Sequence, residues 1–350
     1  GGQFNASTGK EVTAYYIKAK ADKVETCLDV LSDMLTNSKL DSLEIEKEKG
    51  VIIEELNLDE DTPARKIGDI YERLLYGDTP LGWDIGGEKD IIRKITREDF
   101  ISYMKSFYSA HNMTVVVAGG IKTERTEELV QKYLGGMEKF DTLKFNKFSL
   151  AQDKSQLLLK TKKTEQAHIA IGFRTVNNTH PDKYPLDVLA AILGGGMSSR
   201  LFHEVREKRG LGYYVSTSSD TYQDAGSMVS MAGIDPKRIK EAISIIIQEH
   251  LKVSNVSKVS KGELTKAKEY LKGNLVLTLE NSRSVAYYYA SQELLEDKIN
   301  NPQDVINKID AVTLERVENV AKKYFVGKGL NLAVIGNFES GQEFENLLHL

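Results

Sequence analysis

Hydrophobic and polar positions along the chain change from strand spacing to helical spacing. Residues 3–20 alternate and are rich in β-forming residues, which predicts a strand or a hairpin. Residues 22–35 carry apolar side chains at helical spacing, and Cys27 lies on this apolar face, so we interpret it as a core residue. Further helices are predicted over 41–56, 64–76 and 96–108, with Asp41 and Thr96 as N-terminal caps, and a buried strand is predicted over 114–118.

Part of this pattern occurs twice, at an offset of 217 residues. Residues 95–100 match 312–317, residues 105–108 match 322–325, and residues 114–119 match 331–336. A match at nearly the same offset aligns Glu44 with Glu263 and Glu55 with Asn274. A period this long predicts two tandem domains with one topology and not a solenoid, whose repeats span about 20–50 residues.

The second copy begins near Gln156, with strands predicted over 157–160 and 168–173 and a helix over 183–193. The offset places the corresponding start roughly sixty residues before Gly1, so we expect the first domain to lack its opening strands and first helix. We predict domains at 1–140 and 157–350, joined by a linker at 141–156. Strands followed by runs of helices, without regular βαβ alternation, indicate an α+β fold.

Composition limits the classes of function. The 350 residues include 47 Lys and Arg and 51 Asp and Glu, and the net charge of −4 argues against a nucleic-acid partner or a polybasic membrane arm. A single cysteine excludes an intrachain disulfide and a multi-thiolate metal site. No apolar run reaches the roughly 18 residues that a membrane span needs.

The acidic stretch over residues 44–55 contains the first candidate site. Glu48 and Glu55 are two helical turns apart and therefore share a helix face. Glu55 follows the apolar run 51–53, so we expect it to be partly buried, and a buried carboxylate needs a cation or hydrogen-bond donors. The alternatives are a solvated face with Glu–Lys pairs and a metal-binding carboxylate. The second copy has Ala267 and Asn274 at the equivalent positions, which favours chemistry in one copy only.

The stretch over residues 206–214 is the second candidate. Arg206 lies near a predicted helix end, Gly210 and Gly212 interrupt the helix, and Tyr213 opens a strand. One alternative is helix capping with an aromatic side chain packed on the sheet. The other is an arginine and a tyrosine hydroxyl that bind a peptide carbonyl or an oxyanion.

Two other features of the sequence give weaker evidence for a functional site. The glycine run 194–196 lacks the spacing and the lysine of a phosphate-binding loop, so we interpret it as a hinge or a close backbone approach and not as a nucleotide site. No two histidines are four or five residues apart, so neither H-E-x-x-H nor H-x-x-E-H occurs in these 350 residues. We interpret each of them as a surface or packed residue: His111, His168, His180, His203, His250 and His349.

Four stretches together resemble one protein family. They are GGQFNAST (1–8), EKGVIIEE (48–55), TEQAHI (164–169) and LGGGMSSRLF (193–202) running on to Tyr213. In this order they resemble the insulinase (pitrilysin) family of zinc metallopeptidases, in its bacterial processing-peptidase-like branch, which is related to the mitochondrial processing peptidase. The resemblance implies half of a clamshell, made of two homologous α/β-sandwich domains, the first of them incomplete here at its N-terminus.

The resemblance also implies a zinc site in the first domain. Its ligands are an inverted H-x-x-E-H helix and a distal glutamate, which matches Glu55, and Glu48 matches a carboxylate that supports the ligands. Counting back places both histidines and the general base roughly twenty residues before Gly1, inside the block that the repeat predicts to be missing. The chain alone is therefore not expected to bind catalytic zinc, since Glu55 supplies one ligand only.

The remaining matches concern the substrate. Asn5 and Ala6 match an edge strand along which a substrate peptide lies extended, and Arg206 and Tyr213 match a pair in the second domain that reaches the substrate near the metal. We therefore expect a zinc-dependent endopeptidase of extended peptides, presequences or unfolded proteins, with Glu48, Arg206 and Tyr213 in catalytic roles. The resemblance favours a homodimer or a paired subunit. The single cysteine and the lack of a visible export signal favour a bacterial-type cytoplasm. The alternative is a non-catalytic peptide-binding or scaffold subunit.

Overall fold

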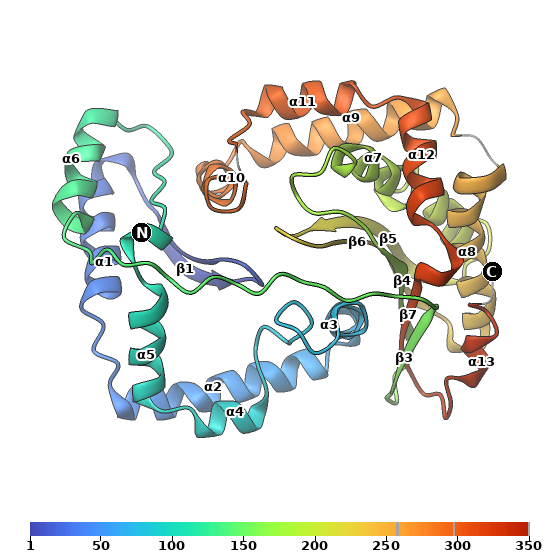
Figure 1. The fold of residues 1–350 in the computed structure, drawn as a ribbon, viewed down its shortest axis with the longest axis horizontal. Coiled ribbons are helices and arrows are strands. Elements are labelled where there is room, and N and C mark those ends of the chain that lie inside the picture. Colours follow the sequence, from blue (N-terminus) through green and yellow to red (C-terminus); the bar gives the residue numbers. More distant parts are fainter. Residues whose placement is uncertain (257–258, 297, 349–350) are drawn as a thin grey trace. The chain divides into compact units, whose positions relative to one another are not determined.

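The computed structural model describes residues 1–256, 259–296 and 298–348, so His349 lies outside the described residues. The chain has an α+β fold and forms two compact units, each described by itself (Figure 1). Unit 1 comprises Gly1–Asn57, Ile85–Asn146 and Val276–Ile299. Unit 2 comprises Leu58–Asp84, Lys147–Leu275 and Asn300–Leu350.

Unit 1 consists of one hairpin and a set of helices. The hairpin predicted over residues 3–20 is confirmed, because β1 (Gln3–Thr8) pairs antiparallel with β2 (Thr13–Lys18). Helices α1 and α6 pack against each other and each contributes one buried leucine, Leu28 and Leu129, while Cys27 on α1 is half-buried. The helices of this unit are α1 (Val24–Thr36), most of α2 (Ser42–Glu60), α4 (Lys89–Lys94), α5 (Arg97–Phe107), α6 (Thr123–Leu134) and α10 (Ser282–Leu295).

The helix caps follow their sequence signals. Asp41 Oδ1 accepts hydrogen bonds from two backbone N–H groups in the first turn of α2, at 2.9 and 3.2 Å. Thr96 and Asp99 form a reciprocal capping box at the start of α5. Thr313, 217 residues after Thr96, caps α12 (Leu314–Tyr324) in unit 2 by accepting a hydrogen bond from Arg316 N–H, without the reciprocal bond of the capping box. Both sequence copies therefore begin this helix with the same local interaction, which satisfies backbone donors that the helix leaves unpaired.

The two copies diverge after these helices. The second copy continues into strand β7 (Leu330–Gly336), which pairs with a strand on either side. The strand predicted over residues 114–118 is wrong: this segment has no regular secondary structure, and the Val115 side chain is 47% exposed. A strand requires a neighbour for its backbone hydrogen bonds, and within the described residues no segment pairs with 114–118.

Unit 2 is built around a mixed five-stranded sheet. The strand order is β3-β7-β4-β6-β5, with β3 and β7 parallel and the other neighbours antiparallel. The strands predicted over 157–160 and 168–173 are confirmed as β3 and β4. The other three strands complete the set: β3 (Gln156–Thr161), β4 (Ala167–Arg174), β5 (Gly212–Thr221), β6 (Gly226–Ile234) and β7 (Leu330–Gly336).

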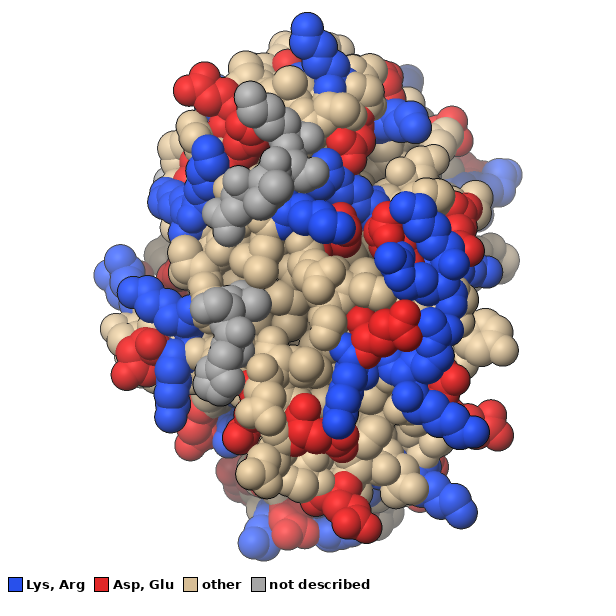
Figure 2. Space-filling model, turned by 90° about the vertical axis from the view of Figure 1, so that its right-hand side faces the viewer, with Lys and Arg blue, Asp and Glu red and all other residues tan. Residues whose placement is uncertain are grey.

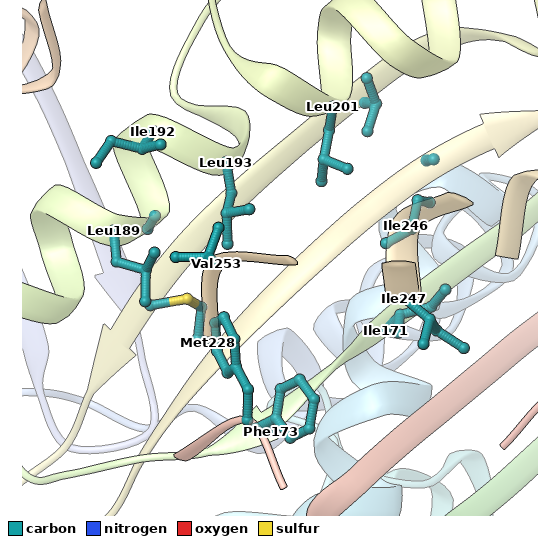
Figure 3. Close-up of a cluster of buried hydrophobic side chains, with 14 of the residues drawn as sticks. Ile171, Phe173, Leu189, Ile192, Leu193, Leu201, Met228, Ile246, Ile247 and Val253 are labelled. Atoms are coloured by element: carbon teal, nitrogen blue, oxygen red, sulfur yellow. The ribbon is translucent and has the colours of Figure 1, made fainter. Parts of the chain in front are cut away.

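Helices cover both faces of this sheet. Apolar side chains of α7, α8 and α12 pack on one face, and α3 packs on the other. Figure 3 shows the larger core, where leucines and isoleucines of α7 and α8 meet side chains of β4 and β6 such as Phe173 and Met228. Each fully buried side chain of this size contributes about 2 kcal/mol. The helices of unit 2 are α3 (Pro63–Tyr76), α7 (Lys183–Gly194), α8 (Ile239–Leu251), most of α9 (Lys261–Thr278), α11 (Pro302–Asp310), α12 and the short α13 (Gln342–Glu345).

Positive and negative side chains are interspersed on the surface of unit 2 that Figure 2 shows.

The α+β class is confirmed. The sheet of unit 1 has two strands within the described residues, so a second complete tandem domain is not established. Residues 135–155 contain neither helix nor strand, and the boundaries 1–140, 141–156 and 157–350 stay a prediction.

His250 makes the stability of unit 2 dependent on pH. The imidazole is 1% exposed and packs against the rings of Phe173 and Phe325, which stack on each other, and its Nε2 is 3.0 Å from the hydroxyl of Ser230. Burial lowers the pKa of His250 from 6.5 to about 4. Below about pH 6.5 the imidazole therefore binds a proton in the unfolded chain but not in the folded chain. The contribution of His250 to the free energy of unfolding is present above this pH and is lost as the pH falls towards 4.

We expect the free energy of unfolding to fall by about 2 kcal/mol between pH 7 and pH 5 because of this residue. Urea denaturation at both pH values measures the change. A His250→Gln variant, which keeps a hydrogen-bonding group without titrating in this range, should show a smaller decrease. Equal decreases in both proteins would remove His250 as the cause.

Candidate functional site

Helix α2 carries both candidate carboxylates. Glu48 and Glu55 are both exposed, and no hydrogen bond or ion pair from any described residue reaches either carboxylate. The expected partial burial of Glu55 is wrong. Leu56 is the buried residue of this turn, with 8% exposure, and successive side chains on a helix are separated by about 100°. Glu55 is therefore rotated away from the packed face and remains free to bind a ligand.

The equivalent helix of unit 2 lacks this feature. On α9, Ala267 stands at the position of Glu48 and is 5% exposed, and Asn274 stands at the position of Glu55. Among the described residues, no group of three or more His, Cys, Asp and Glu side chains is arranged to hold a metal ion. The described residues therefore do not make a zinc site by themselves.

Strand β1 is the candidate peptide-binding edge of unit 1. All six of its residues are exposed, and Asn5 and Ala6 pair with Tyr16 and Tyr15 of β2. No described strand lies on the other side of β1. An unpaired strand edge carries backbone donors and acceptors that an extended peptide can use.

Contacts within unit 1 hold the hairpin from the side of β2. The hydroxyls of Tyr15 and Tyr108 are 2.7 Å apart. Arg283 at the start of α10 donates a hydrogen bond to the Tyr16 hydroxyl at 2.8 Å, and its guanidinium lies 5.0 Å from the ring centre of Tyr16. Because these contacts involve β2, the open edge of β1 stays accessible.

Arg206 and Tyr213 are placed in unit 2. Arg206 lies in a π-helical turn, Phe202–Glu207, where its exposed guanidinium is 5.0 Å from the ring centre of Phe202. Tyr213 lies at the start of β5 and is 75% exposed. No described carboxylate pairs with Arg206, and no described group is hydrogen-bonded to the Tyr213 hydroxyl. Both polar groups are therefore available to a ligand.

The backbone between these two residues is tightly constrained. Gly210 has a φ of 57°, in the left-handed region that favours glycine. Leu211 N–H donates to the Val205 carbonyl at 2.8 Å, which ties the end of the π-helical turn to the start of β5. The pairing of β5 with β6 then shifts by one residue between Gly212 and Tyr214, which leaves Tyr213 as the extra residue of a β-bulge.

The sequence did not assign a role to the residues beside this bulge. The Tyr214 hydroxyl lies 3.0 Å from Nδ1 of His168, and both residues are in register with Gly233 of β6. His168 and Tyr214 belong to the stretches TEQAHI and GYY, but a contact across two strands has no local sequence signal. The doubled tyrosine after two glycines is the only hint that this strand start is unusual.

The glycine run 194–196 has a packing role, as predicted. A Cβ on Gly195 would lie 2.7 Å from Cα of Ala191, and one on Gly196 would lie 3.3 Å from the ring of Tyr270. The run begins with the last residue of α7 and does not lead from a strand into a helix. These glycines allow close approach of the backbone and do not form a phosphate-binding loop.

Arg200, which follows this run, forms the main ion pair near it. Its Nε and Nη2 donate to the two carboxylate oxygens of Glu263 at 2.5 and 3.1 Å, and Glu263 also accepts from Ser260 N–H at the start of α9. Burial raises the pKa of Glu263, but the bonds from Arg200 and Ser260 outweigh this effect and lower it to about 2. Arg200 therefore stabilises the fold and is not free to bind substrate.

Comparisons with known proteins identify relatives of the whole chain. The family model for Insulinase (Peptidase family M16) matches residues 1–86, and the model for the Peptidase M16 inactive domain matches residues 94–271. YmxG, an uncharacterized zinc protease of Bacillus subtilis, is 35% identical over 325 residues, which are 93% of this chain and 78% of YmxG. The beta subunit of the mitochondrial-processing peptidase of Lentinula edodes is 28% identical over 98% of this chain and 76% of its own length.

Solved structures share the fold. A protease from Helicobacter pylori superposes with a TM-score of 0.87 at 23% identity, over 96% of this chain and 82% of its own. A chain of complex III2 from Candida albicans superposes with a TM-score of 0.85 at 16% identity, over 99% of this chain and 86% of its own. Among the described helices, none has the length and apolar character needed to cross a bilayer.

The copies offer a matched test of the Arg200–Glu263 pair. Glu263→Gln should destabilise the protein by about 2 kcal/mol, because it leaves a largely buried guanidinium without its counter-charge. Glu44, at the equivalent position of the first copy, forms an exposed pair with Lys47, and Glu44→Gln should cost less than about 0.5 kcal/mol. Chemical denaturation of both variants measures the two decreases in the free energy of unfolding. Equal decreases would contradict the conclusion that the Arg200–Glu263 pair stabilises the fold.

Proposed function

The chain belongs to the insulinase family of peptidases (peptidase family M16), and from this premise we propose that it is a zinc-dependent endopeptidase of the processing-peptidase type. Its substrates are extended peptides, including presequences and unfolded segments. One observation carries the proposal: Glu55 is exposed on α2 and has no polar partner among the described residues, in a chain that is 35% identical to a zinc protease over 93% of its length. In this proposal Glu55 is one zinc ligand and Glu48 supports the metal site.

The proposal requires histidine ligands other than those of this sequence, because no H-x-x-E-H spacing occurs in the 350 residues. The role of unit 1 is then to contribute Glu55 and the open edge of β1, where Asn5 and Ala6 bind the peptide backbone. The role of unit 2 is to contribute Arg206 and Tyr213, whose free guanidinium and hydroxyl bind the substrate carbonyl.

We also propose that the two copies are tandem homologous domains, at 1–140 and 157–350 with a linker at 141–156. The order of helices supports this, because α2 to α5 in the first copy correspond to α9 to α12 in the second. A short 3-10 turn follows each set, Ala110–Asn112 and Gly327–Gly329, at the same offset of 217 residues.

The alternative is a peptide-binding subunit that holds substrate without cleaving it, as a homodimer or beside a catalytic partner. In this alternative the complete gene product carries no intact H-x-x-E-H, whereas in the peptidase it does. Expression of the complete gene product separates the two functions. Cleavage of a fluorogenic peptide that stops on addition of a chelator and returns with zinc supports the peptidase, whereas peptide binding without cleavage supports the scaffold.

Glu55→Gln tests the metal-binding role. In the complete gene product, loss of one charged ligand should lower the affinity for zinc more than tenfold. Zinc content after dialysis, measured by atomic emission, gives a readout that does not require activity. Glu54→Gln is the matched control, since Glu54 is an exposed neighbour on the same helix. Unchanged zinc content in Glu55→Gln would remove Glu55 from the site.

Tyr213→Phe tests the substrate contact. Removal of the hydroxyl should lower kcat about tenfold or more with little change in KM, if the contact is made mainly in the transition state. Tyr103→Phe is the control, because Tyr103 is also exposed, at 57%, but lies on α5. A rise in KM with unchanged kcat would assign Tyr213 to ground-state binding only.

A further inference from the structure

The start of β5 is the one irregular point in the sheet of unit 2 among the described strand pairs. Gly212 pairs with Ile234 of β6, and Tyr214 pairs with the next residue, Gly233, so that Tyr213 has no partner on β6. A bulge leaves its extra residue outside the ladder and re-aims that side chain. The direction of Tyr213 therefore depends on whatever holds the bulge in place.

A hydrogen bond across two strands holds the residue that follows the bulge. His168 of β4 and Tyr214 of β5 are both in register with Gly233, and their side chains meet across it, with 3.0 Å between Nδ1 and the hydroxyl. His168 is only 8% exposed. Burial lowers the pKa of His168 and raises the pKa of Tyr214 to about 12. A neutral imidazole and a protonated phenol thus form a donor–acceptor pair at neutral pH.

Two glycines make this arrangement possible. A Cβ on Gly233 would lie 2.5 Å from the ring of Tyr214 and 2.7 Å from Oε1 of Gln166. A Cβ on Gly212 would lie 2.2 Å from the carbonyl oxygen of Gly233. None of these three distances is sterically possible, so the bulge and the side-chain contact require glycine at both positions.

The other end of the bulge is held by the backbone. Leu211 N–H is bonded to the Val205 carbonyl, and the Leu211 carbonyl accepts a hydrogen bond from Asp235 N–H at 3.0 Å. The turn that carries Arg206 is thereby joined to β5 on one side of Tyr213, and the Tyr214–His168 contact fixes the strand on the other side. The Tyr213 hydroxyl has no hydrogen bond to a described residue, so its position depends on the backbone on either side of it.

We propose that His168 and Tyr214 are positioning residues: their hydrogen bond across Gly233 holds the β5 bulge in the form that directs Tyr213 and its hydroxyl towards substrate. The catalytic consequence rests on the proposed peptidase function. The conformational consequence, an ordered Tyr213, does not depend on it.

The kinetic test uses the complete gene product with zinc. Tyr214→Phe and His168→Leu should each lower kcat about tenfold with a smaller effect on KM, because the tyrosine contact is displaced and not deleted. His168→Gln, which can still bond to the Tyr214 hydroxyl, should recover part of the loss. In a Tyr213→Phe background, Tyr214→Phe should have no further effect on kcat. Additive losses would contradict an action through Tyr213.

Thr217→Val is the matched structural control. Thr217 lies on the same strand, and its hydroxyl forms a buried hydrogen bond of 2.7 Å with Ser230 of β6, away from the bulge. This variant loses a buried bond between β5 and β6 and should keep wild-type kcat. If it lowers kcat as much as Tyr214→Phe does, a general loosening of the sheet explains both and the proposal is overturned.

A spectroscopic test is independent of activity. With 3-fluorotyrosine at position 213, the 19F NMR signal should be a single narrow line in the wild type, shifted or broadened in Tyr214→Phe and His168→Leu, and unchanged in Thr217→Val. An unchanged line in both variants overturns the positioning role, whatever the activity. A line that responds in a protein that does not cleave peptides supports the positioning role and rejects the peptidase function.

Discussion

The structure of unit 2 depends on the burial of strands β4, β6 and β7 on both faces. Helices α7, α8 and α12 cover one face and α3 covers the other, so these strands consist almost entirely of apolar and small residues. The layers are close enough that a Cβ on Gly172 would lie 1.9 Å from the carbonyl oxygen of Met228 and 2.6 Å from the Tyr71 hydroxyl. Strand β5, at the sheet edge, can deviate from regular pairing because β6 beside it is held so firmly.

Much of this fold is predictable from the sequence because its signals are local. Caps such as Asp41 and Thr96 act within one turn of their helices, and the apolar runs of β3 and β4 are short and continuous. The errors come from information that is not local. Whether residues 114–118 form a strand depends on a neighbour elsewhere in the chain, and the exposure of Glu55 depends on a rotation of about 100° relative to Leu56. The bulge at Tyr213 is a property of pairing with β6, which no pattern within β5 encodes.

The candidate residues of the two units illustrate two ways to keep a group available for binding. In unit 1, Glu55 and the edge of β1 face solvent and have no described polar partners, so they are available without further support. In unit 2, Tyr213 is also exposed. The backbone on either side of it is held by closely packed glycines, backbone hydrogen bonds and buried side chains. The matching positions on α9 hold Ala267 and Asn274, so this helix offers no carboxylate there.

The bulge at the start of β5 makes chain length, and not only residue type, a determinant of the tyrosine's direction. A strand alternates its side chains between two faces, so a relative with one residue fewer between Leu211 and Tyr214 would return to a regular pleat. Such a chain would keep its pairing with β6 but would lack the extra residue that the bulge places outside the ladder. In this segment, the deletion of a single residue therefore changes the direction of the tyrosine more than a substitution does.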